Sequence, residues 1–166
     1  MCKPASDSSN YSREESWESK PKENIHSDNK NQNKYLLLCE GDSATGGIQA
    51  ALGRDFYSYF SLKGKPLNAL EADMKKIKDN DEFKNVATIL NLDLGSDYQN
   101  LTHDMIVCAQ DADLDGQHIM ALLLSFFKRF TPTLIKEGKI GYLRTPLYYA
   151  KKKNSVEKYF FTTEEY

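Results

Sequence analysis

The chain has 166 residues, of which 22 are Lys or Arg and 24 are Asp or Glu, so its formal net charge is −2. With 40% hydrophobic and 28% charged residues, it has the composition of a globular protein of about one domain. No apolar run reaches the roughly 18 to 20 residues of a membrane span, which argues against a membrane protein. The near-neutral charge gives no general sign of a nucleic-acid partner, so such a partner must be argued from local chemistry.

The N-terminal residues contain no apolar stretch of the kind found in a secretory signal peptide. The three cysteines have no paired spacing, which excludes a disulfide framework and a zinc site. We therefore expect a cytoplasmic protein.

Residues 1–33 are expected to form a disordered tail or linker. They contain seven Ser and five Asn, and Ile25 is their only Leu, Ile or Val. Such a segment buries too little apolar surface to offset the entropy lost on ordering. The folded domain is therefore expected to occupy residues 34–166. A helix is expected to begin near Thr162, so the domain is expected to be truncated at its C-terminal end.

The first predicted element of the domain is a strand over residues 35–39, an unbroken apolar run typical of a strand buried on both faces. A helix is predicted to start at Asp42 or Ser43 and to run to Leu52, where Gly53 ends it. The next predicted elements are a strand over 60–62, a basic turn over 63–66 and helices over 67–78 and 82–90.

A second buried strand is predicted over residues 105–109, again directly followed by acidic residues. Apolar residues at helical spacing predict an amphipathic helix over 116–130, which Pro132 ends. Three short strands are predicted over 139–144, 147–151 and 156–161. Alternating helices and buried strands predict an α/β, Rossmann-like domain with a central, mainly parallel sheet flanked by helices.

Carboxylates follow both of the buried strands. Glu40 and Asp42 come after the first, and Asp111, Asp113 and Asp115 come after the second. Ligands of parallel sheets bind at the carboxyl ends of strands, so these groups converge there if the two strands are neighbours. Their mutual repulsion requires protons or a cation, and oxygen ligands without His or Cys favour Mg²⁺.

The acidic residues also fit parts of other known patterns. The Asp-x-Asp-x-Asp-Gly sequence begins an EF-hand, but the twelfth position, which needs a bidentate Glu, is Leu122. Asp111 and Asp113 after an apolar strand also fit a Mg²⁺-dependent phosphatase of the haloacid-dehalogenase type. A phosphate-binding loop at 41–47 is not supported, because Lys-Ser/Thr does not follow Gly46. A solvated acidic turn would explain either cluster alone.

Four motifs in order resemble the Toprim domain of type IIA DNA topoisomerases over roughly residues 35 to 166. They lie at 40–44 (Glu-Gly-Asp-Ser-Ala), 62–68 (Leu-Lys-Gly-Lys-Pro-Leu-Asn), 111–119 (Asp-Ala-Asp-Leu-Asp-Gly-Gln-His-Ile) and 146–148 (Pro-Leu-Tyr). The Asp-Ala-Asp and Pro-Leu-Tyr segments resemble the B-type subunits of bacterial gyrase and topoisomerase IV more than the eukaryotic enzyme. Departures from the family pattern occur at Thr45, Gln110 and Gln117.

The resemblance implies a role for each carboxylate. Glu40 corresponds to the catalytic glutamate, a metal ligand and general acid/base. Asp111 and Asp113 correspond to the Mg²⁺-binding pair, and Asp115 to a position associated with a second metal location.

Basic residues are also assigned by position. Lys63 and Lys65 match the family's basic turn near DNA, and His118, in the first turn of the helix after the acidic cluster, is a candidate DNA contact. Residues 151–153 are three consecutive lysines, and Lys128, Arg129 and Arg144 add positive charge to the same third of the chain. This charge would hold phosphates or simply be solvated.

The resemblance further implies the partners of the chain. They are double-stranded DNA, an A-type subunit that carries the cleavage tyrosine, and the ATPase domain of the B-type subunit, since ATP would bind through a domain absent from this chain. The chain alone would then be an incomplete, ATP-dependent DNA topoisomerase. The alternatives are another Toprim nuclease or primase, and the haloacid-dehalogenase-type phosphatase.

Overall fold

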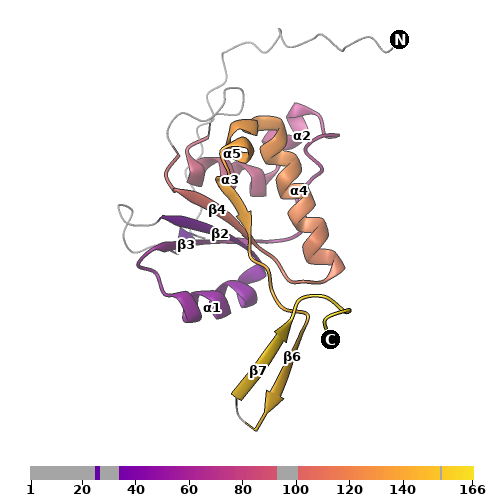
Figure 1. The fold of residues 1–166 in the computed structure, drawn as a ribbon. Helices are drawn as coiled ribbons and strands as arrows, with labels where there is room; N and C mark the ends of the chain where they lie inside the picture. The colour runs from indigo at the N-terminus through magenta and orange to yellow at the C-terminus, as the bar shows by residue number, and fades with distance from the viewer. Residues whose placement is uncertain (1–24, 27–33, 93–100, 154) are drawn as a thin grey trace, which may run out of the picture.

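The computed structural model describes residues 25–26, 34–92, 101–153 and 155–166 (Figure 1). Five strands form a central sheet in the order β1-β3-β2-β4-β5. β2 pairs in parallel with β3 and β4, and β4 pairs in parallel with β5, so the predicted mainly parallel sheet is confirmed. The strands are β1 (Ile25–His26), β2 (Tyr35–Glu40), β3 (Tyr57–Leu62), β4 (Met105–Ala109) and β5 (Ile140–Tyr142).

Helices cover both faces of the sheet (Figure 1). They are α1 (Gly41–Leu52), α2 (Met74–Asp79), α3 (Asp81–Leu90), α4 (Leu114–Phe130) and α5 (Pro132–Lys136). Alternate residues of β2 point to opposite faces, so Leu36 and Leu38 join the core formed with α2 to α5, while Leu37 and Cys39 pack with Ile48 of α1. This double burial explains why β2 is an unbroken apolar run.

The helix predicted over residues 67–78 is wrong in its first half, because α2 begins only at Met74. The Asn68 carbonyl accepts the N–H groups of Glu71 and Ala72, which closes a turn. Arg129 of α4 donates to the carbonyls of Ala69 and Ala72, with an N–O distance of 2.6 Å to the latter. Those carbonyls would otherwise accept bonds within a helix, so α4 holds the segment in a different conformation.

Two smaller differences concern element boundaries. Pro132 was predicted to end a helix, but it also occupies the first turn of the short helix α5, where its missing N–H costs no hydrogen bond. β3 begins at Tyr57, three residues before the predicted strand, because Tyr57 pairs with Tyr35 of β2.

Part of the predicted tail has regular structure. Ile25 and His26 form the edge strand β1, which pairs antiparallel with Tyr59 and Phe60 of β3. The other residues of the predicted tail, 1–24 and 27–33, lie outside the described residues. The tail boundary at residue 33 therefore stays a prediction. The truncation predicted at the C-terminal end of the domain is likewise still a prediction.

The last described segment has the hydrogen bonds of a helix start. Thr162 Oγ1 accepts the N–H of Glu165 at 3.3 Å, and Glu165 Oε2 accepts the N–H groups of Phe161 and Thr162. This reciprocal arrangement is a capping box, but residues 161–165 form bends and turns, so the helix start near Thr162 stays a prediction.

β6 (Tyr148–Lys152) and β7 (Ser155–Phe160) form a separate two-stranded antiparallel sheet. This hairpin extends away from the rest of the domain, on the side opposite α2 and α5 (Figure 1). Two of the three C-terminal strands predicted from the sequence therefore leave the central sheet. None of the helices in the described ranges is long and apolar enough to cross a membrane.

Candidate metal centre

The two acid-bearing strands are neighbours in the sheet. β2 and β4 run parallel, with Cys39 opposite Ala109. Glu40 and the residues that follow Ala109 therefore leave the sheet at the same edge. This is the carboxyl-terminal edge, where parallel sheets bind their ligands.

The chain turns sharply from β2 into α1 at Gly41. This residue has a φ of 77°, in the left-handed region where a side chain would be strained. Glu40 is the N-cap of α1, but its side chain makes no capping hydrogen bond. The turn therefore leaves the Glu40 carboxylate available at the sheet edge.

The Glu40 carboxylate is partly desolvated and close to other negative charges. Its Oε2 atom is buried and has no hydrogen-bond partner among the described residues. Burial raises the pKa of Glu40, and the charges of Asp111, Asp113 and Asp115 raise it further, while a hydrogen bond from the Asp111 backbone opposes the shift. The four predicted ligands therefore form one electrostatic group.

Two of these carboxylates already have partners. Asp113 is the N-cap of α4, and its Oδ1 accepts the Gly116 N–H at 2.8 Å. Asp115 Oδ1 lies 2.7 Å from Lys65 Nζ in an exposed ion pair, which lowers the pKa of Asp115. Asp111 is exposed, and no hydrogen bond of its carboxylate is recorded with the described residues.

Within the described ranges, no three acidic, His or Cys side chains are already arranged to hold a metal ion. The donor set nevertheless fits Mg²⁺, because it consists only of carboxylate oxygens and includes the unpartnered, buried Oε2 of Glu40. The EF-hand alternative is excluded, since Leu122 lies in the buried face of α4 and not in a loop.

Gly116 is a site residue that the sequence analysis did not single out. A β-carbon on Gly116 would overlap the Asp111 carbonyl oxygen and lie 2.9 Å from the Asp111 backbone nitrogen. The first turn of α4 therefore lies directly against the Asp111 backbone. The signal in the sequence was a glycine inside the first turn of a predicted helix, where another residue would stabilise the helix better.

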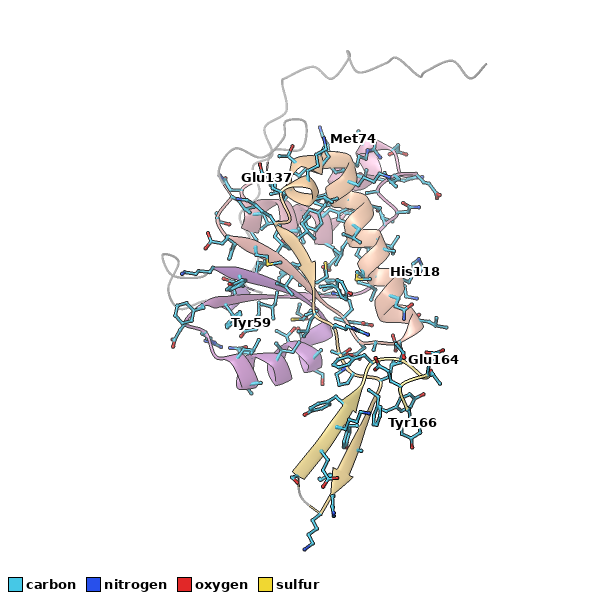
Figure 2. All side chains as sticks on the ribbon, viewed as in Figure 1. Tyr59, Met74, His118, Glu137, Glu164 and Tyr166 are labelled. Carbon is cyan, nitrogen blue, oxygen red and sulfur yellow. The ribbon has the colours of Figure 1, made fainter. Side chains whose placement is uncertain are left out.

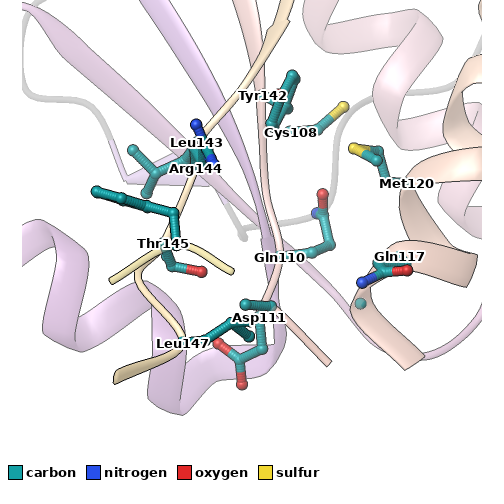
Figure 3. Close-up of a pocket in the computed structure, with 13 residues that line it drawn as sticks. Cys108, Gln110, Asp111, Gln117, Met120, Tyr142, Leu143, Arg144, Thr145 and Leu147 are labelled. Atoms are coloured by element: carbon teal, nitrogen blue, oxygen red, sulfur yellow. The ribbon is translucent and has the colours of Figure 1, made fainter. Parts of the chain in front are cut away.

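A hollow of about 280 Å³ lies next to Asp111, between the start of α4 and the segment that leads into β6 (Figure 3). Gln110 is one of its lining residues and is 7% exposed. Its Nε2 donates to the Leu38 carbonyl at 2.7 Å, which ties the end of β4 to β2, while its Oε1 has no partner among the described residues. The departure from the family pattern at Gln110 thus supports the strand ends that position the carboxylates.

The predicted basic turn lies beside the acidic group. Lys65 reaches Asp115 in the first turn of α4, and the Lys63 N–H donates to Glu82 Oε1 at 3.2 Å. His118 lies on the exposed side of α4, pointing away from the sheet (Figure 2). Sequence reasoning missed Glu82, because nothing local links it to a turn 19 residues earlier.

Arg129 does not belong to the positive surface that the sequence pointed to. Its guanidinium donates to the carbonyls of Ala69 and Ala72, so it is a structural ligand of the 69–72 turn. Arg144 stacks on the ring of Phe161, with its guanidinium carbon 4.7 Å from the ring centroid. Lys128 is exposed on α4.

Residues 35–144 match the family profile of the Toprim domain. The chain belongs to the Toprim domain family. This match covers β2 to β5 and includes all four candidate carboxylates, so the fold class predicted from the sequence is confirmed.

Relatives of this Toprim domain include bacterial and eukaryotic proteins. It is 40% identical over 119 residues to the B-type subunit of a type 2 topoisomerase from Aquifex aeolicus, which covers 70% of this chain and 15% of that protein. It is 38% identical over 141 residues to the B-type subunit of DNA topoisomerase 4 from Borreliella burgdorferi, covering 84% of this chain and 23% of the relative. DNA topoisomerase 2 of Plasmodium falciparum is 39% identical over 139 residues, covering 79% of this chain and 10% of that protein.

A solved structure shows the same architecture. The DNA-binding, cleavage and re-ligation domain of Plasmodium falciparum topoisomerase II matches with a TM-score of 0.78 and 32% identity, covering 89% of this chain and 22% of that chain. The Toprim chain thus spans between a tenth and a quarter of the length of these relatives.

Proposed function

We propose that this Toprim domain is the Mg²⁺-binding part of a type IIA DNA topoisomerase, as in B-type subunits of gyrase and topoisomerase IV. In this proposal it supports cleavage and religation of double-stranded DNA by a tyrosine that an A-type subunit supplies. ATP hydrolysis would belong to an ATPase domain outside this chain. The names of the relatives support the reaction class, and the site geometry supports the role of the chain within it.

One observation carries the proposal. Glu40 projects from the end of one parallel strand with a buried, unpartnered oxygen, next to Asp111 at the end of the neighbouring strand. A carboxylate in this state is stabilised by a cation or by a proton, and both are needed in phosphoryl transfer. Glu40 and Asp111, with Asp113, would hold the Mg²⁺.

The residues of the chain fit the two directions of the reaction. In cleavage, the tyrosine hydroxyl loses its proton and its oxygen bonds to the phosphorus, while the bond from phosphorus to the 3′ oxygen breaks and that oxygen gains a proton. Religation reverses each of these changes. Glu40 is the candidate that gives and takes this proton, because its raised pKa moves it toward the range useful for acid–base chemistry. Bound Mg²⁺ would stabilise negative charge that develops on the leaving oxygen. Lys63 and Lys65 would bind neighbouring phosphates.

The alternative functions have less support. Membership of the Toprim family removes the reason to invoke a haloacid-dehalogenase-type phosphatase. A Toprim primase or nuclease would share the carboxylates. However, the motif at residues 62–68 resembles that of type IIA topoisomerases, and the relatives described above are named as topoisomerases.

The test compares Mg²⁺ binding by the wild-type chain with that of Asp111→Asn, whose exposed carboxylate has no hydrogen bond recorded with the described residues. At ten times Kd, Mg²⁺ should stabilise the wild type by about 1.4 kcal/mol, which raises Tm by about 3 to 6 °C. Asp111→Asn should lose most of this shift, while the exposed control Asp79→Asn should keep it. With an A-type subunit and ATPase domain supplied, Asp111→Asn should also slow Mg²⁺-dependent DNA cleavage. Equal shifts and equal cleavage in all three proteins would refute the proposed site.

Lys65 should compete with the metal for Asp115. Removing its ammonium group 2.7 Å from Asp115 leaves the acidic group more negative, so Lys65→Ala should bind Mg²⁺ more tightly. Since the pair is exposed, we expect an effect of only about two- to fivefold in Kd. Isothermal titration calorimetry with Mg²⁺ would measure this change in Kd. Lys76→Ala, which removes the exposed Lys76–Asp73 pair elsewhere in the chain, is the control. Weaker Mg²⁺ binding in Lys65→Ala would contradict this account of the site.

A further inference from the structure

The β6–β7 hairpin, residues 148–160, is strongly basic, and we call it the basic arm. It carries Lys151, Lys152, Lys153 and Lys158 against a single acid, Glu157, so its net charge is +3 in a chain whose total is −2. The four lysines are all exposed. Charge of one sign is therefore concentrated on an element that projects from the domain (Figure 1).

Some lysines of the chain pair with acidic side chains, but the arm lysines have no acidic partner among the described residues. Lys65 pairs with Asp115 at 2.7 Å, and Lys84 pairs with Asp81 at 3.5 Å. No such pair is recorded for the arm lysines within the described ranges. Their charge is therefore not neutralised by the domain and is available to an anionic partner.

One face of the arm is partly covered by the end of the chain, with Phe160 8% and Tyr148 41% exposed, and the other face is open. Tyr148 and Phe160 pair across the strands, and the ring of Tyr166 packs on both, with centroids 4.8 and 5.4 Å away (Figure 2). Tyr149 and Tyr159 pair on the opposite face, where they are 60% and 54% exposed. The more open face thus presents two adjacent phenol rings. Lys151 to Lys153 lie toward the tip of the hairpin, and Lys158 lies over the ring of Phe160 on the other face, 4.8 Å from its centroid.

This composition favours nucleic acid over protein as the partner. Tyrosines are common in protein interfaces, but lysines are depleted there, and the arm has four. Lysine and tyrosine side chains both contact the phosphates and sugars of DNA. The combination matches a backbone contact that does not depend on base sequence.

The base of the arm adjoins the candidate metal centre. Leu147, just before β6, and Phe161, just after β7, line the same hollow as Asp111 (Figure 3). The five residues of β6 span about 17 Å at about 3.4 Å per residue. The arm therefore reaches about this far from the hollow that Asp111 lines.

We propose that the basic arm binds the phosphate backbone of duplex DNA, outside the site where the carboxylates act. This inference rests on the proposed function, because it takes the same DNA as the ligand of both parts. The arm would act through charge and phenol contacts with the backbone, outside the reacting centre.

The test measures binding of the full chain to a 30-base-pair duplex by fluorescence anisotropy at several salt concentrations. The variant Lys151→Ala/Lys152→Ala/Lys153→Ala should bind at least about tenfold more weakly at 0.1 M salt and lower the salt slope by about 2 to 3. The control Lys75→Ala/Lys76→Ala/Lys136→Ala removes the same charge from exposed positions on α2 and α5 and should change the slope little. Replacing the three arm lysines with arginine should retain the wild-type slope.

An unchanged slope in the arm variant, or an equal loss in the control, would overturn the inference. So would intact DNA binding together with lost binding to the A-type subunit, since the partner would then be a protein. Melting curves with Mg²⁺ separate this result from the proposed function. A normal Mg²⁺ shift with no effect of the arm refutes only the arm, whereas DNA binding through the arm without any Mg²⁺ shift in the wild type supports the arm and refutes the metal site.

Discussion

Replacing Gly116 with alanine should destabilise the domain and disable its metal centre together. The new β-carbon would overlap the Asp111 carbonyl oxygen and lie 2.9 Å from its nitrogen, and both are backbone atoms that cannot move aside like a flexible side chain. Overpacking of this kind costs typically 1 to 3 kcal/mol, so Tm should fall by roughly 2 to 12 °C. Displacement of Asp111 should also weaken Mg²⁺ binding by at least about tenfold, since Mg²⁺ demands near-ideal ligand geometry.

Gly47→Ala is the matched control for this substitution. Gly47 lies inside α1, and a β-carbon there would have no neighbour within 4 Å. Alanine in a helix interior is favoured over glycine by roughly 0.5 to 1 kcal/mol, so this variant should melt slightly above the wild type. Calorimetry and Mg²⁺ titration of both variants make the comparison. If Gly116→Ala behaved like Gly47→Ala, the close approach of α4 to Asp111 would play no part in the site.

Glu40→Gln should have opposite effects on stability and on catalysis. The substitution keeps the size of the side chain but removes a charge that is partly buried and repelled by three carboxylates. Metal-free Glu40→Gln should therefore be more stable than the wild type near neutral pH. In the reassembled enzyme it should slow both cleavage and religation by at least about a hundredfold, since a general acid/base group contributes about 10² to 10⁴.

The pH dependence of this stability difference has a defined sign. The pKa of Glu40 is raised on folding, so protonated Glu40 favours the folded state. This contribution to the stability of the wild type is fully present below pH 4.5, the ordinary pKa of a glutamate. That contribution is lost as the pH rises through the folded pKa. The Tm difference between Glu40→Gln and the wild type should thus be small at pH 4 and should grow toward pH 7 in the absence of Mg²⁺. Mg²⁺ should reverse it, because the cation stabilises only the carboxylate.

Thermal melts over this pH range, with and without Mg²⁺, test the expectation. Glu71→Gln, which changes an exposed glutamate away from the four carboxylates, serves as the control and should show neither effect. A Tm difference that is independent of pH would mean that Glu40 is not under the strain of neighbouring charges. Unchanged cleavage would remove Glu40 from the reaction.

The parts of the site that the sequence predicted depend on local patterns. Unbroken apolar runs at 35–39 and 105–109 indicate strands buried on both faces, and this burial is characteristic of a parallel sheet. Carboxylates directly after both runs then have to leave the sheet at its carboxyl edge. Glu40 and Asp111 could therefore be paired before the structure was known, and the motif order indicated the Toprim family.

Only the tertiary structure decided which carboxylates and backbone carbonyls are already bound by a distant side chain. The Lys65–Asp115 pair joins residues 50 positions apart, and Arg129 captures carbonyls 57 and 60 positions earlier, which prevents a helix from starting at residue 67. Helical periodicity describes which face of a segment is apolar, but it does not say which distant side chain takes its carbonyls. The predicted helix therefore failed where a long-range hydrogen bond replaced a local one.

The same limit applies to Gly116 and to the basic arm. The sequence by itself determined two acidic strand ends, a glycine after the third Asp, and a lysine-rich pair of strands. The tertiary structure decided that the glycine lies against the Asp111 backbone and that the strands leave the sheet to form a hairpin beside the acidic site. The physical reason is that composition and periodicity report each segment's own burial, whereas contact between segments depends on how the whole core packs.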